Sequence, residues 1–343
     1  MTIDAREMPR DSAFGPAVLS ARIRSAPEDF IVEEVLGFEP SGQGEHAFLQ
    51  VEKRGANTVW VAQQLARWAG VAEHAVGYAG LKDRHALTRQ AFTVHVPGRE
   101  LPALETLNIE GVRVLDVQRH QRKLPRGALR GNRFTLTLRE VVGEPDAIES
   151  RLQQIADRGV PNAFGSQRFG HEQGNVAAAR AMFAGGRVGR EKRSILLSAA
   201  RSELFNRVLC ERIRAGTWDL AEPGDVFMLD GSHSIFGPTP IDDALRQRVA
   251  THDVHPTGAL WGAGELRSGD AVLALEKSVA EADLELSEGL VRAGLKHERR
   301  ALRLPVRELA WRVNADTLVL SFFLPSGSYA TAVLDALGSM HQG

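Results

Sequence analysis

The densest group of reactive side chains lies in the segment GYAGLKDRHALTRQAF, residues 77–92. Lys82, Asp83, Arg84 and His85 follow one another after a glycine-rich approach. The flanking cations favour an ionised Asp83, which can then act as a nucleophile or general base near neutral pH. The same spacing suits a charged, solvated turn in which Asp83 caps a helix. On spacing alone, the second interpretation is the more common.

A second segment, residues 117–139, is rich in cations and contains no Asp or Glu. Each cation that neutralises a phosphate releases counterions, so this run predicts RNA binding that tolerates sequence changes and depends strongly on salt. A solvated face is the alternative. The run also contains Arg133 and Arg139, and the expected phosphate contacts are Arg119, Arg122, Lys123, Arg126 and Arg130.

Three further motifs combine polar groups with aromatic rings. Within RGNRF, Asn132 can read a base edge beside Phe134, although a turn residue and a core residue are the ordinary interpretations. Within FFLPSGSYATAVL, Tyr329 can stack on a base or simply cover the core. The motif NAFGSQRFGHEQGN, residues 162–175, is either a shaped functional loop or a packed turn between domains.

The first half of the chain must hold most of these motifs, and its pattern is mixed. Residues 21–24 form a short extended run, and alternation over residues 90–96 and 133–138 predicts strands. Residues 58–68 have apolar residues at helical spacing, after an asparagine suited to the N-cap position, Asn57. The first half is therefore expected to be α+β.

The residue composition of the chain changes near residue 157. Ala- and Arg-rich stretches predict helices over residues 175–183 and 197–213, and Gly- and Pro-rich loops are expected around residues 223–240. An apolar strand over residues 318–324, with a short helix starting near Tyr329, can rejoin the first domain. A chain of 343 residues favours two domains, or one domain with a large insertion.

Several enzyme classes lose support from what the sequence lacks. It has no GxxxxGK[ST] loop, no GxGxxG after a strand, no HExxH and no GxSxG. Cys210 is the only cysteine, and His252 and His255 are expected to be surface residues in a loop without a thiolate partner. We therefore expect no metal and no organic cofactor.

Charge and hydropathy indicate a soluble protein. The formal net charge of −1 means that a polyanion must be held by a local patch. The N-terminal residues lack a signal-peptide pattern, and the longest apolar stretches are too short to span a membrane. A cytoplasmic location without a membrane partner is expected.

Together the motifs resemble the TruD family of tRNA pseudouridine synthases. That family carries a GLKDRxAxTxQ block, an RGNxF block, an NxFGxQRFG block and an LPxGSxAT block, in the order found here. The resemblance extends from about Arg24 to Val333. Departures are Arg24 where the family often has lysine, Ala163 where it has an aromatic residue and Tyr329 where it has phenylalanine.

The resemblance implies a fold and a substrate. The fold is α+β: a pseudouridine-synthase mixed or antiparallel sheet forms a catalytic domain, which an inserted α+β TRUD domain splits in sequence. The expected boundaries are 1–156 and 304–343 for the catalytic domain and 157–303 for the insertion. The implied substrate is tRNA, usually at uridine 13, with no cofactor and no obligate protein partner.

The resemblance also assigns residues. Asp83 matches the catalytic aspartate, and Phe30, Asn132 and Tyr329 match positions that hold the target uridine. Arg24 is our hypothesised cationic partner for Asp83. Asp83 could attack C1′ of the ribose, attack C6 of the ring or remove a ribose proton. The alternatives from other classes are a non-catalytic RNA-binding or RNA-folding protein and a glycosidase-like enzyme, for which no second carboxylate stands out.

Overall fold

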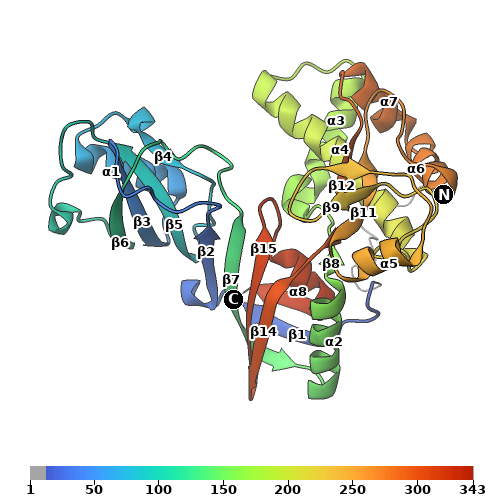
Figure 1. Cartoon of the computed structure of the whole chain (residues 1–343), viewed down its shortest axis with the longest axis horizontal. Helices are drawn as coiled ribbons and strands as arrows, with labels where there is room; N and C mark the ends of the chain where they lie inside the picture. Colours follow the sequence, from blue (N-terminus) through green and yellow to red (C-terminus); the bar gives the residue numbers. More distant parts are fainter. Residues whose placement is uncertain (1–12, 343) are drawn as a thin grey trace. The chain divides into compact units, whose positions relative to one another are not determined.

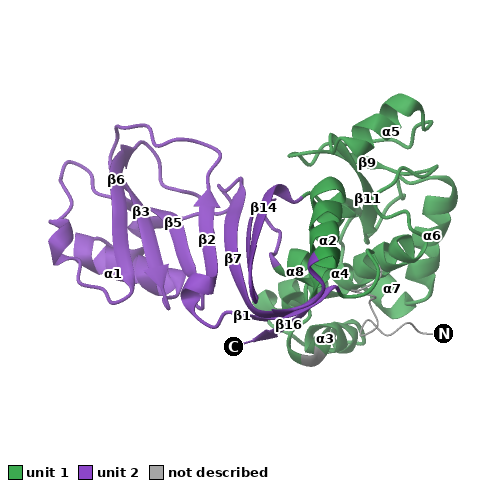
Figure 2. Cartoon of the chain, turned by 90° about the horizontal axis from the view of Figure 1, so that it is seen from below, with its two compact units in different colours: residues 1–17, 146–305, 331–338 green, residues 18–145, 306–330, 339–343 purple. Residues whose placement is uncertain are grey.

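The computed structural model describes residues 13–342, and these form two compact units (Figure 2). Unit 1 contains the described residues up to 17, residues 146–305 and residues 331–338. Unit 2 contains residues 18–145, 306–330 and 339–342. The chain therefore passes between the units at 17/18, 145/146, 305/306, 330/331 and 338/339. Domain boundaries after residues 156 and 303 stay a prediction.

A large mixed sheet makes up most of unit 2 (Figure 1). Its main path runs β14-β15-β7-β2-β5-β3-β6, with β1 and β16 paired beside β7 and with β4 paired to β5. The strands are β1 (Leu19–Ile23), β2 (Phe30–Val35), β3 (His46–Arg54), β4 (Val76–Tyr78), β5 (Leu87–His95), β6 (Val112–His120), β7 (Gly131–Val142), β14 (Arg307–Asn314), β15 (Thr317–Pro325) and β16 (Gly338–Gln342).

One parallel pair interrupts an otherwise antiparallel path. β2 pairs with β5 in parallel, with Val32 opposite Thr88, and pairs with β7 antiparallel, with Val32 opposite Phe134. Thr88 in turn lies opposite Lys53 of β3. Because directly opposed residues point to the same face, these four side chains share one face of the sheet.

Helix α1 (Thr58–Ala69) contacts β4 and β5 (Figure 1). Asn57 caps it, because its side chain accepts a hydrogen bond from Val59 N, and Gly70 ends it at φ 61°. This confirms the helix and the cap predicted from the sequence. The helix packs Leu65 against a core that includes Phe92.

Unit 1 contains the remaining helices and two small sheets, of order β10-β9-β11-β12 and β13-β8. Its helices are α2 (Pro145–Arg158), α3 (Gly174–Phe183), α4 (Arg190–Arg214), α5 (Asp243–Ala250), α6 (Asp270–Glu281), α7 (Leu284–Arg292) and α8 (Thr331–Leu337). Its strands are β8 (Val160–Pro161), β9 (Phe227–Leu229), β10 (Ile235–Phe236), β11 (Val254–Leu260), β12 (Glu298–Ala301) and β13 (Arg303–Leu304).

Two expectations about this unit were wrong. Residues 223–240 are not only loop, because β9 and β10 pair there as a short hairpin. His255 is not a surface loop residue: it lies in β11, is 3% exposed and contacts Asp230 through Nε2 at 2.9 Å. Both errors arise because Gly and Pro hide short strands from a pattern search.

No helix among residues 13–342 combines the length and the apolar character needed to cross a membrane.

Candidate functional site

Asp83 lies in the loop between β4 and β5. Its Oδ1 accepts a hydrogen bond from His85 N at 2.9 Å, and the chain becomes extended again at Leu87, where β5 begins. The side chain therefore closes a local turn of the kind that aspartate favours. No helix follows, so the helix-cap alternative is wrong. The second carboxylate oxygen is left for another partner.

Arg24 supplies that partner. Its Nη2 lies 3.0 Å from Asp83 Oδ2, and the two side chains are 20% and 32% exposed. The guanidinium carbon lies 4.5 Å from the centre of the Phe30 ring. A guanidinium can stack on a ring while it donates to a carboxylate, and an ammonium lacks this planar geometry. Arg24, Phe30 and Asp83 thus form one contacting group.

The backbone of Arg24 is itself unusual. Its φ is 59°, a left-handed conformation that costs non-glycine residues free energy and is often kept at functional sites. The following turn is held by Asp29, which is 3% exposed and accepts hydrogen bonds from Arg139 Nε and Nη2 at 2.9 and 2.7 Å. The Arg139 guanidinium holds the pKa of the Asp29 carboxyl below its usual value. Arg139 therefore stabilises the turn rather than offering a free cation.

Lys53 is a functional candidate that sequence reasoning missed. It is 0% exposed, and its Nζ donates to Ala56 O at 2.8 Å and to Asp83 O at 3.2 Å. Burial lowers the pKa of Lys53 from 10.5 to about 8, although the charge of Asp83 opposes this. A signal was present: Lys53 continues the buried alternation of Leu49 and Val51 along β3.

A second buried ion pair fixes the residue before Asp83. Lys82 Nζ lies 2.7 Å from Glu34 Oε1, with side-chain exposures of 6% and 1%. The other Glu34 oxygen accepts from Ala91 N at 3.1 Å, and Lys82 N donates to Thr58 Oγ1 at 3.0 Å. The loop that carries Asp83 is therefore bonded to β2 and to Thr58 at the start of α1, and through Glu34 to β5.

Asn132 and Phe134 lie on β7, on the face that carries Glu34 and Val32. Phe134 is 6% exposed and stacks on Phe322 with ring centres 5.4 Å apart, which makes it a core residue. Asn132 is half-buried, and its Oδ1 is buried without a hydrogen-bond partner among the described residues. An unpaired buried carbonyl oxygen costs free energy, so it is a natural place for a ligand donor.

Tyr329 lies in the loop after β15 and is 43% exposed. Within residues 13–342, no hydrogen bond or ring contact joins it to Asp83 or Asn132. Its exposure leaves part of the side chain open to a ligand.

The basic run divides into two groups. Arg119 pairs with Glu100 at 2.6 Å, Arg133 with Glu308 at 2.5 Å, and Arg139 with Asp29. By contrast, no described carboxylate forms an ion pair with the other four cations. These four are Arg122, Lys123, Arg126 and Arg130.

The motif at residues 162–175 is packed within unit 1. Asn206 donates to Phe164 O at 3.0 Å and accepts from Phe164 N at 2.9 Å. The Phe164 ring meets Phe205 edge-on at 5.5 Å, and Arg300 lies 4.2 Å from its centre. These contacts favour a packed loop over an open functional loop, and all of them lie within unit 1 rather than between domains.

Among the described residues, 13–342, no group of three His, Cys, Asp or Glu side chains lies close enough together to hold a metal ion.

Comparison with known proteins first places the fold. A crystal structure titled putative tRNA pseudouridine synthase D (TruD) from Methanosarcina mazei superposes with a TM-score of 0.75 over 98% of each chain, at 21% identity. The expected α+β fold class is thereby confirmed.

Sequence similarity then identifies the family. The family model for tRNA pseudouridine synthase D (TruD) matches residues 17–188 and 183–337. The chain is 54% identical to tRNA pseudouridine synthase D of Xanthomonas axonopodis pv. citri, covering 96% of this chain and 94% of the relative. It is 48% identical to that of Methylococcus capsulatus, with the same coverages. The chain belongs to the TruD family, which confirms the resemblance.

Proposed function

We propose that this protein isomerises uridine to pseudouridine in tRNA, at uridine 13, with Asp83 as the catalytic nucleophile or base. The observation that carries the proposal is the Asp83 carboxylate, paired to Arg24 through one oxygen at 3.0 Å and still 32% exposed. A carboxylate that is held by a cation, yet accessible, is suited to attack or to accept a proton. Family membership supplies the reaction class.

The reaction balances without a redox partner. The bond from N1 to C1′ breaks, the detached uracil turns, and a bond from C5 to C1′ forms. C5 loses its proton to solvent and N1 gains one, so the product is an isomer of the substrate. Asp83 serves by attack on C1′, by attack on C6 or by removal of a ribose proton. In each route its negative charge must be present, and the Arg24 guanidinium stabilises that charge.

The target base must leave the base stack before Asp83 can reach its ribose. Unstacking costs a few kcal/mol, which contacts to the displaced base offset. In this proposal the unpaired Oδ1 of Asn132 accepts a hydrogen bond from uracil N3–H, and the exposed Tyr329 side chain stacks on the displaced base. Phe30 acts by fixing the Arg24 guanidinium, because the ring is only 6% exposed.

Tritium release from tRNA labelled at uridine C5 tests the proposal. We expect release in step with pseudouridine formation, and mapping of the product should place it at position 13. Tight tRNA binding with no release would instead support the RNA-binding or RNA-folding alternative. Free uracil among the products would support the glycosidase-like alternative. Release with the product at another position would leave the reaction intact and reject uridine 13.

A further inference from the structure

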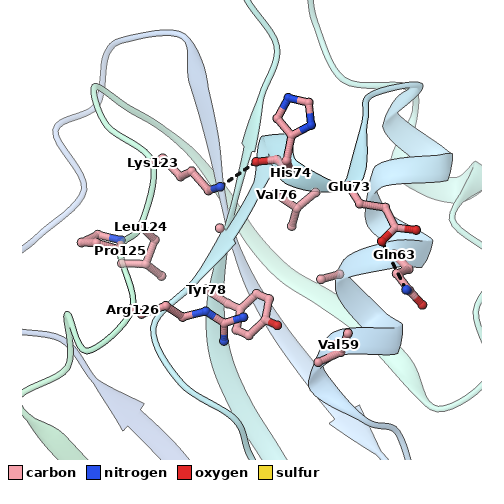
Figure 3. A pocket seen from close by; sticks show the side chains of 12 residues that line it. Val59, Gln63, Glu73, His74, Val76, Tyr78, Lys123, Leu124, Pro125 and Arg126 are labelled. Carbon is pink, nitrogen blue, oxygen red and sulfur yellow. Dashed lines mark hydrogen bonds between the residues drawn. The ribbon is translucent and has the colours of Figure 1, made fainter. Parts of the chain in front are cut away.

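Unit 2 has a pocket that is separate from the Asp83 carboxylate. Its cavity volume is ≈ 730 Å³, within the range of small-molecule sites. One wall is α1, the floor is β4, and the other wall is the loop that follows β6 (Figure 3). The lining residues are Val59, Ala62, Gln63, Glu73, His74, Val76, Gly77, Tyr78, Lys123, Leu124, Pro125 and Arg126.

Tyr78 and Arg126 form the most specific feature of this pocket. The Arg126 guanidinium carbon lies 3.5 Å from the centre of the Tyr78 ring, and Figure 3 shows the two groups overlapping. Tyr78 is only 7% exposed, yet no described residue forms a hydrogen bond with its hydroxyl. The hydroxyl oxygen itself is open to solvent, because it is not among the described buried polar atoms that lack a partner. The hydroxyl is therefore free for a ligand.

Charge is divided between the two walls. The loop wall carries Arg126 and Lys123, neither of which pairs with a described carboxylate, and Lys123 Nζ donates to His74 O at 2.6 Å. The helix side carries Gln63, whose Nε2 donates to Glu73 Oε2 at 3.2 Å. Cations on one side suit a phosphate, and an amide beside a carboxylate suits the polar edge of a base. Val59 and Val76 supply apolar surface between them.

We propose that this pocket binds a second nucleotide of the RNA substrate, in addition to the uridine at Asp83. Arg126 and Lys123 hold its phosphate, and its base packs against Val59 with an edge toward Gln63 and Glu73. The inference rests on the proposed function, since it takes the substrate to be RNA. RNA recognition commonly uses splayed-out bases of this kind, which are hydrogen-bonded at their polar edges.

The pocket is bonded to the loop that carries Asp83. On the loop wall, Gly127 N donates to Ala79 O at 2.8 Å. On the helix wall, Thr58 precedes the lining residue Val59 and accepts from Lys82 N at 3.0 Å. A nucleotide that fills the pocket therefore steadies both walls and, through these two hydrogen bonds, residues 79–83. Binding at the pocket and positioning of Asp83 are thus coupled.

Two substitutions test the pocket directly. Val59→Trp fills its mouth from a side chain that is already 42% exposed, so folding should be preserved. Arg126→Gln removes the cation that stacks on Tyr78. Loss of one bound nucleotide is worth about 1–3 kcal/mol, so each variant should raise the Kd for tRNA by about 5- to 150-fold. The single-turnover rate at saturating tRNA should also fall, because residues 79–83 lose their support.

Matched controls separate the pocket from general charge and bulk. Arg122→Gln removes an exposed cation of the same loop that does not line the pocket, and Gln64→Trp adds the same ring to α1 outside it. Both should change Kd by a smaller factor. Equal effects of Arg126→Gln and Arg122→Gln, together with unchanged binding by Val59→Trp, would overturn the proposal. The wild type's tritium release is measured in parallel, so its absence would reject the isomerase function while the binding comparison still decides the pocket.

Discussion

Two arginine–aspartate pairs, one in each unit, show how differently the same chemistry can be used. In unit 1, Arg212 Nη1 and Nη2 donate hydrogen bonds to Asp225 Oδ1 and Oδ2 at 2.8 and 3.0 Å. The two side chains are 3% and 0% exposed. In unit 2, Arg24 contacts Asp83 through one nitrogen, and both side chains remain open to solvent. The first pair is buried, whereas the second is accessible to solvent.

The surroundings of the two carboxylates differ in the same sense. Asp225 also accepts from Glu222 N at 2.8 Å, so both of its oxygens are used. The Arg212 guanidinium also donates to Thr217 O and Leu220 O. In unit 2, by contrast, Asn132 Oδ1 and the Nε of Arg24, the partner of Asp83, are buried without described partners. A pair whose polar atoms all have hydrogen-bond partners indicates a structural role. Polar atoms without partners beside an exposed carboxylate indicate a ligand site.

The largest expected effect comes from Asp83→Asn. The amide keeps the shape and the hydrogen bond from His85 N, but it is neither a nucleophile nor a base. We expect the single-turnover rate of tritium release to fall by roughly 10⁴-fold or more, on the scale of losing such a group. The thermal midpoint should barely change, because the carboxylate is partly exposed. A variant that still releases tritium at the wild-type rate would reject Asp83 as catalyst.

Asp225→Asn should give the opposite result. Removing one partner from a buried, hydrogen-bonded pair leaves Arg212 with an uncompensated charge, which typically costs about 3–5 kcal/mol. Chemical unfolding should show a loss of that order in the free energy of unfolding, while the folded fraction keeps its rate per molecule. If stability were unchanged and the rate fell, the contrast between the two pairs would be wrong.

The sequence predicted the elements and the motifs better than it predicted what surrounds them. The α1 boundaries, the Asn57 cap and the strand near residues 318–324 followed from periodicity and residue type. Such signals are local, so they are visible in one sequence. The helix-cap interpretation of Asp83 failed because residues 83–86 resemble a cap until the following strand is known.

The buried polar partners near Asp83 were not predictable. Lys53 and Glu34 contact the loop that carries Asp83 only because the strands of the sheet pair in this register. They lie 30 and 48 residues, respectively, from their partners in that loop. Which cations of the basic run are neutralised was equally hidden, since Glu308 and Asp29 lie far from their arginines in sequence. Pairing across distant strands is set by tertiary structure, and a single sequence contains no direct record of it.

Lys53→Met should have an intermediate effect and should change the pH profile. The wild-type rate should fall as pH rises through about 8, because the ammonium beside Asp83 O is lost there. Methionine fills similar space without a charge, so we expect a rate lower by about 10- to 100-fold, a typical loss for one electrostatic group, and no such decline near pH 8.

Stability should respond to pH in the opposite direction. The pKa of Lys53 is lower in the folded chain than its unfolded value of 10.5, so between about 8 and 10.5 the unfolded chain binds more protons. The contribution of Lys53 to the free energy of unfolding therefore rises with pH in that window. Unfolding midpoints of wild type and Lys53→Met should accordingly diverge in favour of the wild type. A rate decline that survives in Lys53→Met would assign it to another group.

The smallest expected effect separates the paired from the unpaired cations of the basic run. Arg130 lacks a described carboxylate partner, whereas Arg119 pairs with Glu100 at 2.6 Å. If Arg130 contacts a phosphate, Arg130→Ala should weaken binding to different RNAs similarly and flatten the slope of log Kd against log salt by about 0.7–0.9. Arg119→Ala should change the slope less, because its charge is already neutralised. Equal salt slopes in the two variants would mean that the ion pair between Arg119 and Glu100 opens when RNA binds. The division of the basic run into paired and free cations would then describe only the protein without RNA.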